Sequence, residues 1–126
     1  MDDRPITSRK VRPPDGPYSS AVERGSAVYF SAQIPTDAAG LVSTGSAAEQ
    51  ARLALDNLRE LLSAAALPVR AIVKTTVYLT DMRDLEAVDA VYGEYFDEPY
   101  PARSTIQVAG LPHGEKVQIE AVALRA

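Results

Sequence analysis

The chain has 126 residues, of which 46% are hydrophobic and 24% charged, a composition typical of one globular domain with a single core. Its formal net charge of -4 provides no basic footprint for phosphate backbones, so nucleic acid is disfavoured as a partner. The sequence has no cysteine and one histidine, which excludes disulfides, thiolate metal sites, a cysteine nucleophile and a His-pair metal site.

Residues 1–14 are predicted to form a flexible, solvated arm, because prolines and basic side chains are concentrated there. Such an arm can also brace a neighbouring subunit. It contains no signal-peptide h-region, and no later run approaches about 18 uninterrupted apolar residues. We therefore expect a cytoplasmic protein that does not span a membrane. Residues 15–126 are predicted to form one domain.

The first half of this domain is predicted to hold a hairpin and a helix. Two short strands at 21–24 and 27–31 flank Gly25 and Ser26, a two-residue spacing that suits a hairpin. The sequence SAAE at 46–49 is a capping box, which predicts the start of a helix. An apolar stripe then recurs at steps of four and three until Pro68, and it is interpreted as core: Ala51, Leu55, Leu58, Leu62 and Ala65.

The second half is predicted to contain three strands and one helix. Residues 72–79 are rich in Val, Thr and Ile at both alternating sets, which indicates a central strand. Asp81 is predicted to cap a helix that ends before Pro99, with Tyr92 and Tyr95 in packing positions. Strands follow at 103–108 and 117–124, and His113, in the turn between them, is predicted to be a solvated loop residue.

The resulting order is β-β-α-β-α-β-β, which predicts an α+β fold with two helices packed on one face of a mixed sheet. Two helices leave the other face of the sheet uncovered. We expect self-association into a closed symmetric oligomer to bury that face. A ligand cleft at the subunit boundary would follow.

Arg103 is the leading candidate for a binding residue. It follows Pro101 at the start of the strand 103–108, which is predicted to be buried. A planar guanidinium binds a carboxylate through paired donors, so an arginine beside a cleft suits a small acid. A structural salt bridge to one of the 17 acidic residues is the alternative, and the sequence leaves both open.

Several segments together resemble the RidA family, also called YjgF or L-PSP. The resemblance covers nearly the whole chain from Gly16 onward, and it is the joint order and spacing of the segments that make it specific. The segments are PYS at 17–19, FSAQIP at 30–35, EQ at 49–50, LDNL at 55–58, VKTTVYLTDM at 73–82, PARS at 101–104 and IEAVA at 119–123.

This resemblance implies a fold like the bacillus-type chorismate mutase, assembled as a homotrimeric barrel with clefts between subunits. It also implies hydrolysis of reactive enamines and imines, such as 2-aminoacrylate, to 2-keto acids and ammonia, with neither metal nor cofactor. By the same resemblance, Arg103 binds the substrate carboxylate, Tyr18 lines the pocket, and the backbone around Ser31 and Ala32 contacts the substrate. Thr105 lies two residues after Arg103, so it shares that face of the strand and can also line the cleft.

The most consequential departure from the family pattern is Gln118. Deaminases of the family place a glutamate fifteen residues beyond the arginine, where it positions the hydrolytic water, and this chain has glutamine there. Glutamine can orient water but cannot accept its proton near neutrality. Glu120 points to the same side of the strand, roughly 6.6 Å further on, and could substitute only if the pocket extends that far.

Two further departures favour a shifted substrate. Ala32 stands where glycine is common in the family, and Asp89, where many relatives carry asparagine, can add negative charge near the cleft. Three functions therefore stay open besides simple deamination. One is an enzyme specialised for another imine or for a cyclisation in a biosynthetic pathway, and another is a non-catalytic trimer that binds small carboxylates or keto acids. An endoribonuclease is disfavoured by the acidic chain.

Overall fold

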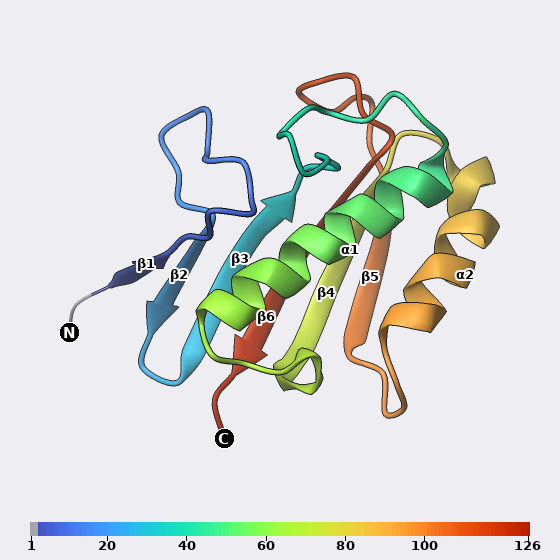
Figure 1. The fold of residues 1–126 in the computed structure, drawn as a ribbon. Coiled ribbons are helices and arrows are strands. Elements are labelled where there is room, and N and C mark those ends of the chain that lie inside the picture. The colour runs from blue at the N-terminus through green and yellow to red at the C-terminus, as the bar shows by residue number, and fades with distance from the viewer. Residues whose placement is uncertain (1–2) are drawn as a thin grey trace.

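The structure, a computed structural model, describes residues 3–126 as one mixed sheet with two helices on one face (Figure 1). The strand order is β1-β2-β3-β6-β4-β5. The strands are β1 (Arg4–Ile6), β2 (Ala21–Arg24), β3 (Ala27–Gln33), β4 (Ile72–Leu79), β5 (Ala102–Gln107) and β6 (Val117–Leu124), and the helices are α1 (Ala47–Ala64) and α2 (Leu85–Tyr95). Short 3₁₀ turns at Val69–Ala71 and Met82–Asp84 precede β4 and α2.

All neighbouring strands are antiparallel except β4 and β5, which are parallel because α2 forms the crossover between them. The predicted hairpin is confirmed: β2 pairs with β3, and Gly25 in its turn has a φ of 60°. The predicted α+β order is also found for β2 to β6. The sequence analysis did not anticipate β1.

The start of the chain is bound to the sheet where an unstructured arm was predicted. β1 pairs with β2, and the side chains of Ile6 and Val11 are buried. Glu23 of β2 binds Arg4 at 2.6 Å and Arg125 at 2.7 Å. Hydrogen bonds to Glu23, the larger effect from Arg125 and the smaller from Arg4, lower the pKa of Glu23 to about 2. Short strands at a sheet edge carry little periodic signal, which is why the pattern missed β1.

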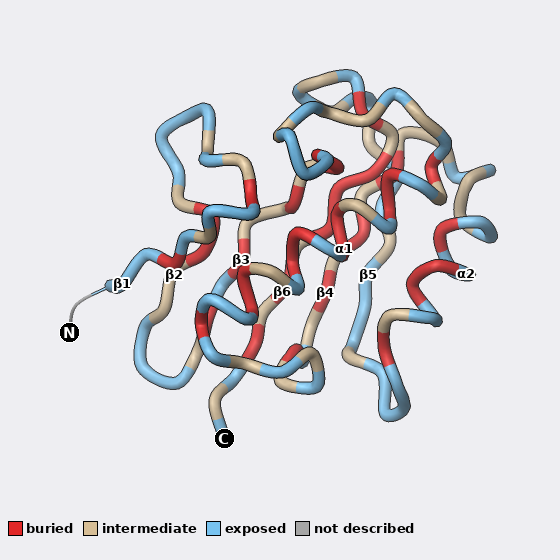
Figure 2. Tube along the Cα trace, viewed as in Figure 1, coloured by how far each residue is buried: buried red, intermediate tan, exposed pale blue. Residues whose placement is uncertain are grey.

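Helix α1 begins as the capping box predicted. The hydroxyl of Ser46 accepts a hydrogen bond from the backbone N–H of Glu49 at 3.2 Å. The predicted apolar stripe is buried along its full length, and it packs on the sheet with residues of β3, β4 and β6 (Figure 2). Asp81 likewise caps the short turn that leads into α2, with its carboxylate accepting from the N–H of Arg83 at 2.9 Å.

The second face of the sheet carries no helix, as predicted (Figure 1). Along β6 the buried residues 117, 119, 121 and 123 face the helices, so Gln118, Glu120, Val122 and Leu124 face the other side. Exposed apolar side chains on this open face include Tyr29, Ile106 and Leu124. An uncovered apolar face of this kind is typical of a protein–protein interface.

Strand β5 corrects one expectation. It was predicted to be buried, but most of its residues are exposed because it lies at the edge of the sheet and pairs only with β4. Arg103 therefore lies at an edge, where its side chain can meet a ligand or another copy of the chain. Among residues 3–126, no helix combines the length and apolar character needed to cross a bilayer.

Candidate functional site

The candidate residues form two groups in a single chain. The arginine group consists of Arg103 and Thr105 on β5 with Asp89 on α2. The glutamine group consists of Gln118 on β6, Ser31 and Ala32 on β3, and Tyr18 in the segment before β2. Arg103 and Gln118 lie on opposite faces of the sheet, and Gln118 does not line the hollow formed by Tyr18, Ser31 and Ala32.

Arg103 is held in place by two contacts with α2. Its Nη1 lies 2.8 Å from Oδ1 of Asp89, and its guanidinium carbon lies 4.8 Å from the centre of the Tyr92 ring. The Tyr92 ring is fixed in turn by a 2.7 Å hydrogen bond between its hydroxyl and that of Thr75. Burial of this ring raises the pKa of the Tyr92 hydroxyl. Tyr92 thus packs, as predicted, and also supports Arg103.

The salt-bridge and anchor hypotheses for Arg103 are compatible. Asp89 accepts through one nitrogen, whereas a guanidinium has five N–H donors, so donors remain for a second carboxylate. The Arg103 side chain keeps 25% of its surface exposed. Thr105 pairs in register with Val77 and Arg103 with Thr75, which places both β5 side chains on the helix side of the sheet. Thr105 is half-buried beside the arginine.

Gln118 points to the open face, beside Tyr78 of β4. Its amide nitrogen donates to Oε2 of Glu115 at 2.9 Å. Glu120 lies on the same face but accepts a hydrogen bond from the hydroxyl of Tyr78, and that bond raises the pKa of Tyr78 to about 12. The Glu120 carboxylate is therefore already engaged, which argues against its replacing Gln118 beside a substrate.

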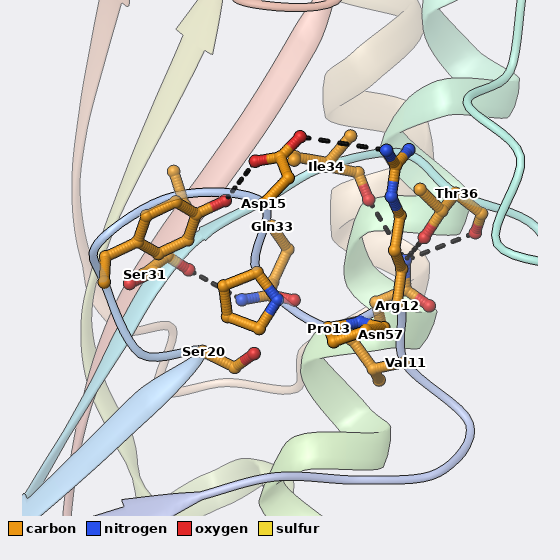
Figure 3. Close-up of a pocket in the computed structure, with 13 residues that line it drawn as sticks. Val11, Arg12, Pro13, Asp15, Ser20, Ser31, Gln33, Ile34, Thr36 and Asn57 are labelled. Atoms are coloured by element: carbon orange, nitrogen blue, oxygen red, sulfur yellow. Dashed lines mark hydrogen bonds and ion pairs between the residues drawn. The ribbon is translucent and has the colours of Figure 1, made fainter.

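A hollow lies between the start of the chain and β3, and Tyr18, Ser31 and Ala32 are among the residues that line it. Figure 3 shows this lining, which also includes Arg12, Asp15 and Gln33. The Ser31 hydroxyl donates to the Ser19 carbonyl at 2.6 Å. The hollow has about 30 Å³ of accessible space, which holds about one or two waters. The hollow is a narrow, solvent-open depression and not an enclosed pocket.

Ala32 lines the hollow, as expected, and its side chain causes no backbone strain. The only non-glycine residue with positive φ among residues 3–126 is Ala66. The backbone at position 32 thus does not need the conformational freedom of glycine, and the methyl group simply narrows the hollow.

The sequence analysis missed a polar network behind Gln118. The Glu115 side chain is completely buried, and the His113 side chain keeps 23% of its surface exposed. His113 Nε2 lies 2.7 Å from Oδ2 of Asp15, and Asp15 accepts from the Tyr18 hydroxyl at 3.2 Å. Both hydrogen bonds lower the pKa of Asp15, and the bond with His113 has the larger effect.

The prediction that His113 is a solvated loop residue is therefore wrong in part: it lies in a turn but is half-buried between two carboxylates. A charged residue two positions before a strand carries no periodic signal, so nothing in the pattern marked Glu115 as buried. Within the described part of the chain, no cluster of three or more His, Asp or Glu side chains is placed to hold a metal ion.

The two groups cannot meet on one ligand within a single chain. Arg103 is in register with Thr75, which faces α2, and Gln118 is in register with Tyr78, which faces the opposite side. Two strand spacings and a three-residue offset separate their backbones by about 14 Å, far more than the length of a three- or four-carbon acid. A small ligand that contacts both side chains would have to lie between two copies of the chain.

Comparison with known proteins assigns the chain to a family. The family model described as Endoribonuclease L-PSP matches residues 9–125. The human 2-iminobutanoate/2-iminopropanoate deaminase is 42% identical over 123 residues, which cover 97% of this chain and 90% of the human protein. The protein therefore belongs to the RidA/YjgF/L-PSP family.

Solved structures show the same fold. Escherichia coli TdcF, solved with bound serine, superposes with a TM-score of 0.91 at 39% identity and covers 98% of this chain and 99% of its own. RidA from an Antarctic Psychrobacter gives a TM-score of 0.92 at 34% identity, with 97% and 99% covered. The resemblance stated from the sequence is confirmed, and the fold is that of YjgF proteins.

Proposed function

We propose that the protein hydrolyses small 2-imino acids and their enamine tautomers to 2-keto acids and ammonia. The observation that carries this proposal is Arg103: a partly exposed guanidinium, fixed by Asp89 and Tyr92 on an edge strand, with donors left for a substrate carboxylate. A deaminase of 2-iminobutanoate and 2-iminopropanoate that is 42% identical over 97% of the chain supports it.

In the proposed reaction, Arg103 holds the carboxylate and Gln118 orients a water toward the imine carbon. Water attacks the protonated C=N carbon, and the new C–O bond forms as the π electrons move to nitrogen. One proton of the added water moves to the amine nitrogen, which gives a tetrahedral aminol with a hydroxyl and an ammonium group. The C–N bond then breaks, ammonia leaves with the bonding electron pair, and the hydroxyl proton leaves as the keto group forms. Because an iminium carbon is strongly electrophilic, orientation and charge complementarity can suffice without a strong base.

We further propose that three copies assemble so that the arginine group of one copy faces the glutamine group of its neighbour. The placement of Arg103 and Gln118 on opposite faces of the sheet supports this. The exposed side chains of Tyr29, Ile106 and Leu124 on the open face give the contact its apolar surface. Light scattering should then report about three times the chain mass of 13.5 kDa.

The activity is tested by generating 2-aminoacrylate in place with a serine dehydratase and following ammonia release. The wild-type protein should accelerate release, and Arg103→Ala should abolish the acceleration. Keto-acid binding should weaken by about 2–5 kcal/mol, the cost of removing one partner of a buried charge pair. Arg83→Ala is the matched control, since Arg83 pairs with Asp81 at an exposed position elsewhere. Unaccelerated release by a trimer that binds keto acids would refute the deaminase.

A second candidate is an enzyme for a different imine, including one that cyclises. The combination of Gln118, Asp89 and Ala32 favours it, because all three alter the wall or the charge of the proposed cleft while Arg103 is kept. Such an enzyme would bind keto acids through Arg103 and turn over 2-aminoacrylate slowly. A panel of imines made from other amino acids by an amino acid oxidase separates the two candidates.

A further inference from the structure

Glu115 is the one buried carboxylate among residues 3–126, and the proposed function does not use it. Its residue exposure is 1%, and it lies in the loop just before β6. A carboxylate removed from water is costly unless hydrogen bonds and charges compensate. The reason for its position must therefore lie in its contacts.

Those contacts all lead to the proposed site. Oε1 accepts from the backbone N–H of His113 at 2.7 Å, and Oε2 accepts from Nε2 of Gln118 at 2.9 Å. The ring of His113 lies alongside, with Nδ1 3.6 Å from Oε2. The carboxylate is thus placed directly behind the side chain that is proposed to hold water.

We infer that Glu115 is a positioning residue that sets the orientation of the Gln118 amide, an inference that rests on the proposed function. An ionised carboxylate accepts hydrogen bonds and donates none, so the end of the amide that faces it must be the NH₂ group. The amide oxygen is then turned the other way, where it accepts a hydrogen bond from water. A free glutamine can present either end, and the NH₂ end would donate a hydrogen bond to the water oxygen, engaging one of its lone pairs and making the water a weaker nucleophile.

The network extends this control to a second pocket residue. His113 links Glu115 to Asp15, and Asp15 accepts from the hydroxyl of Tyr18 at 3.2 Å. Gln118 on β6 and Tyr18 before β2 are far apart in the sequence, and this chain of contacts joins them. The family resemblance implies a carboxylate at position 118 itself. In this chain the carboxylate belongs to Glu115, and Gln118 lies between it and the proposed water.

This arrangement changes what Gln118→Glu should do. Alone, that substitution sets a second carboxylate against Glu115 in a buried position, where two like charges cannot both stay ionised. Glu115→Gln combined with Gln118→Glu restores complementarity with the partners exchanged: the amide lies behind and the carboxylate lies in front. The double variant should therefore be more active than either single variant.

The experiment compares wild type, both single variants and the double variant in the dehydratase-coupled assay, with Glu86→Gln as a control for loss of one negative charge. Glu115→Gln should lower kcat by about 10- to 100-fold, the range for losing a group that orients a functional side chain, with KM nearly unchanged. The double variant should recover at least the wild-type kcat. An undiminished kcat in Glu115→Gln, or a double variant no more active than the better of the two single variants, would overturn the inference.

A second measurement reads the orientation without turnover. In wild type, one side-chain amide proton of Gln118 should be shifted downfield and protected from exchange in ¹⁵N NMR spectra, assigned with Gln118→Ala. Glu115→Gln should abolish that shift. An unshifted amide in wild type would contradict the positioning role even if the enzyme is active. If wild type shows no turnover, the proposed function fails, and this measurement alone decides the role of Glu115.

Discussion

Asp89→Asn tests the state of Arg103 most directly, because it removes the charge that now competes for the guanidinium. Asp89 and Arg103 lie 2.8 Å apart with 45% and 25% of their side chains exposed, a setting in which an ion pair contributes about 0.2–1 kcal/mol. Two carboxylates on one guanidinium lie about 6 Å apart and repel by about 0.7 kcal/mol in bulk water, and by more beside the protein.

Relief of this repulsion should strengthen binding of a keto acid by about 1 kcal/mol, or about 5-fold in Kd. Calorimetric titration with pyruvate in low-salt buffer measures it. Glu86→Gln removes the same charge from the same helix without touching the contact, so it should leave Kd within about twofold. The advantage of Asp89→Asn should shrink as salt is added, because the repulsion is screened.

The result that would refute this reasoning is an Asp89→Asn variant that binds pyruvate no more tightly than Glu86→Gln does. Arg103 would then owe its position to Asp89, so that losing the carboxylate frees the arginine from its binding geometry. The contact with Tyr92 would in that case be too weak to hold the guanidinium alone.

Two further predictions concern stability. Arg125 and Arg4 lower the pKa of Glu23 to about 2, so its ion pairs stabilise the fold above the ordinary pKa of 4.5 and are lost as the pH falls toward 2. Glu23→Gln should therefore flatten the dependence of the urea midpoint on pH in this range. An unchanged slope would contradict the prediction. Leu58 lies on the buried face of α1 and is completely buried, so Leu58→Ala should lower the free energy of unfolding in urea by about 2–5 kcal/mol at fixed protein concentration. Leu53 on the same helix is half-buried, so Leu53→Ala should lower it clearly less.

The main elements could be predicted because each has a local cause. The capping box at Ser46, the apolar stripe of α1 and the period-two pattern of β6 are properties of neighbouring residues, and all three reappear in the structure. Edge and centre are not local properties. Strand β5 reads like an interior strand, and only the sheet order shows that it has one neighbour.

The candidate site shows the same difference between residues with a local signal and residues whose role depends on distant contacts. Arg103 was singled out because a family motif carries it, and Gln118 because it stands where the family has glutamate. Glu115 and His113 could be recognised only from contacts across the loop before β6. The partnership of Arg103 with Asp89 was one of many that the sequence allowed, and the register of α2 against β5 selected it. Pairwise geometry of this kind is set by packing and not by composition.

The placement of Arg103 and Gln118 on opposite faces of the sheet has a thermodynamic consequence. A small acid that contacts both must bridge two copies, so binding and assembly are linked reactions. Saturating ligand should lower the concentration at which the oligomer falls apart, and dilution should weaken apparent affinity by the same free energy. The subunit contact would then be part of the binding equilibrium, and protein concentration a variable that sets activity per chain.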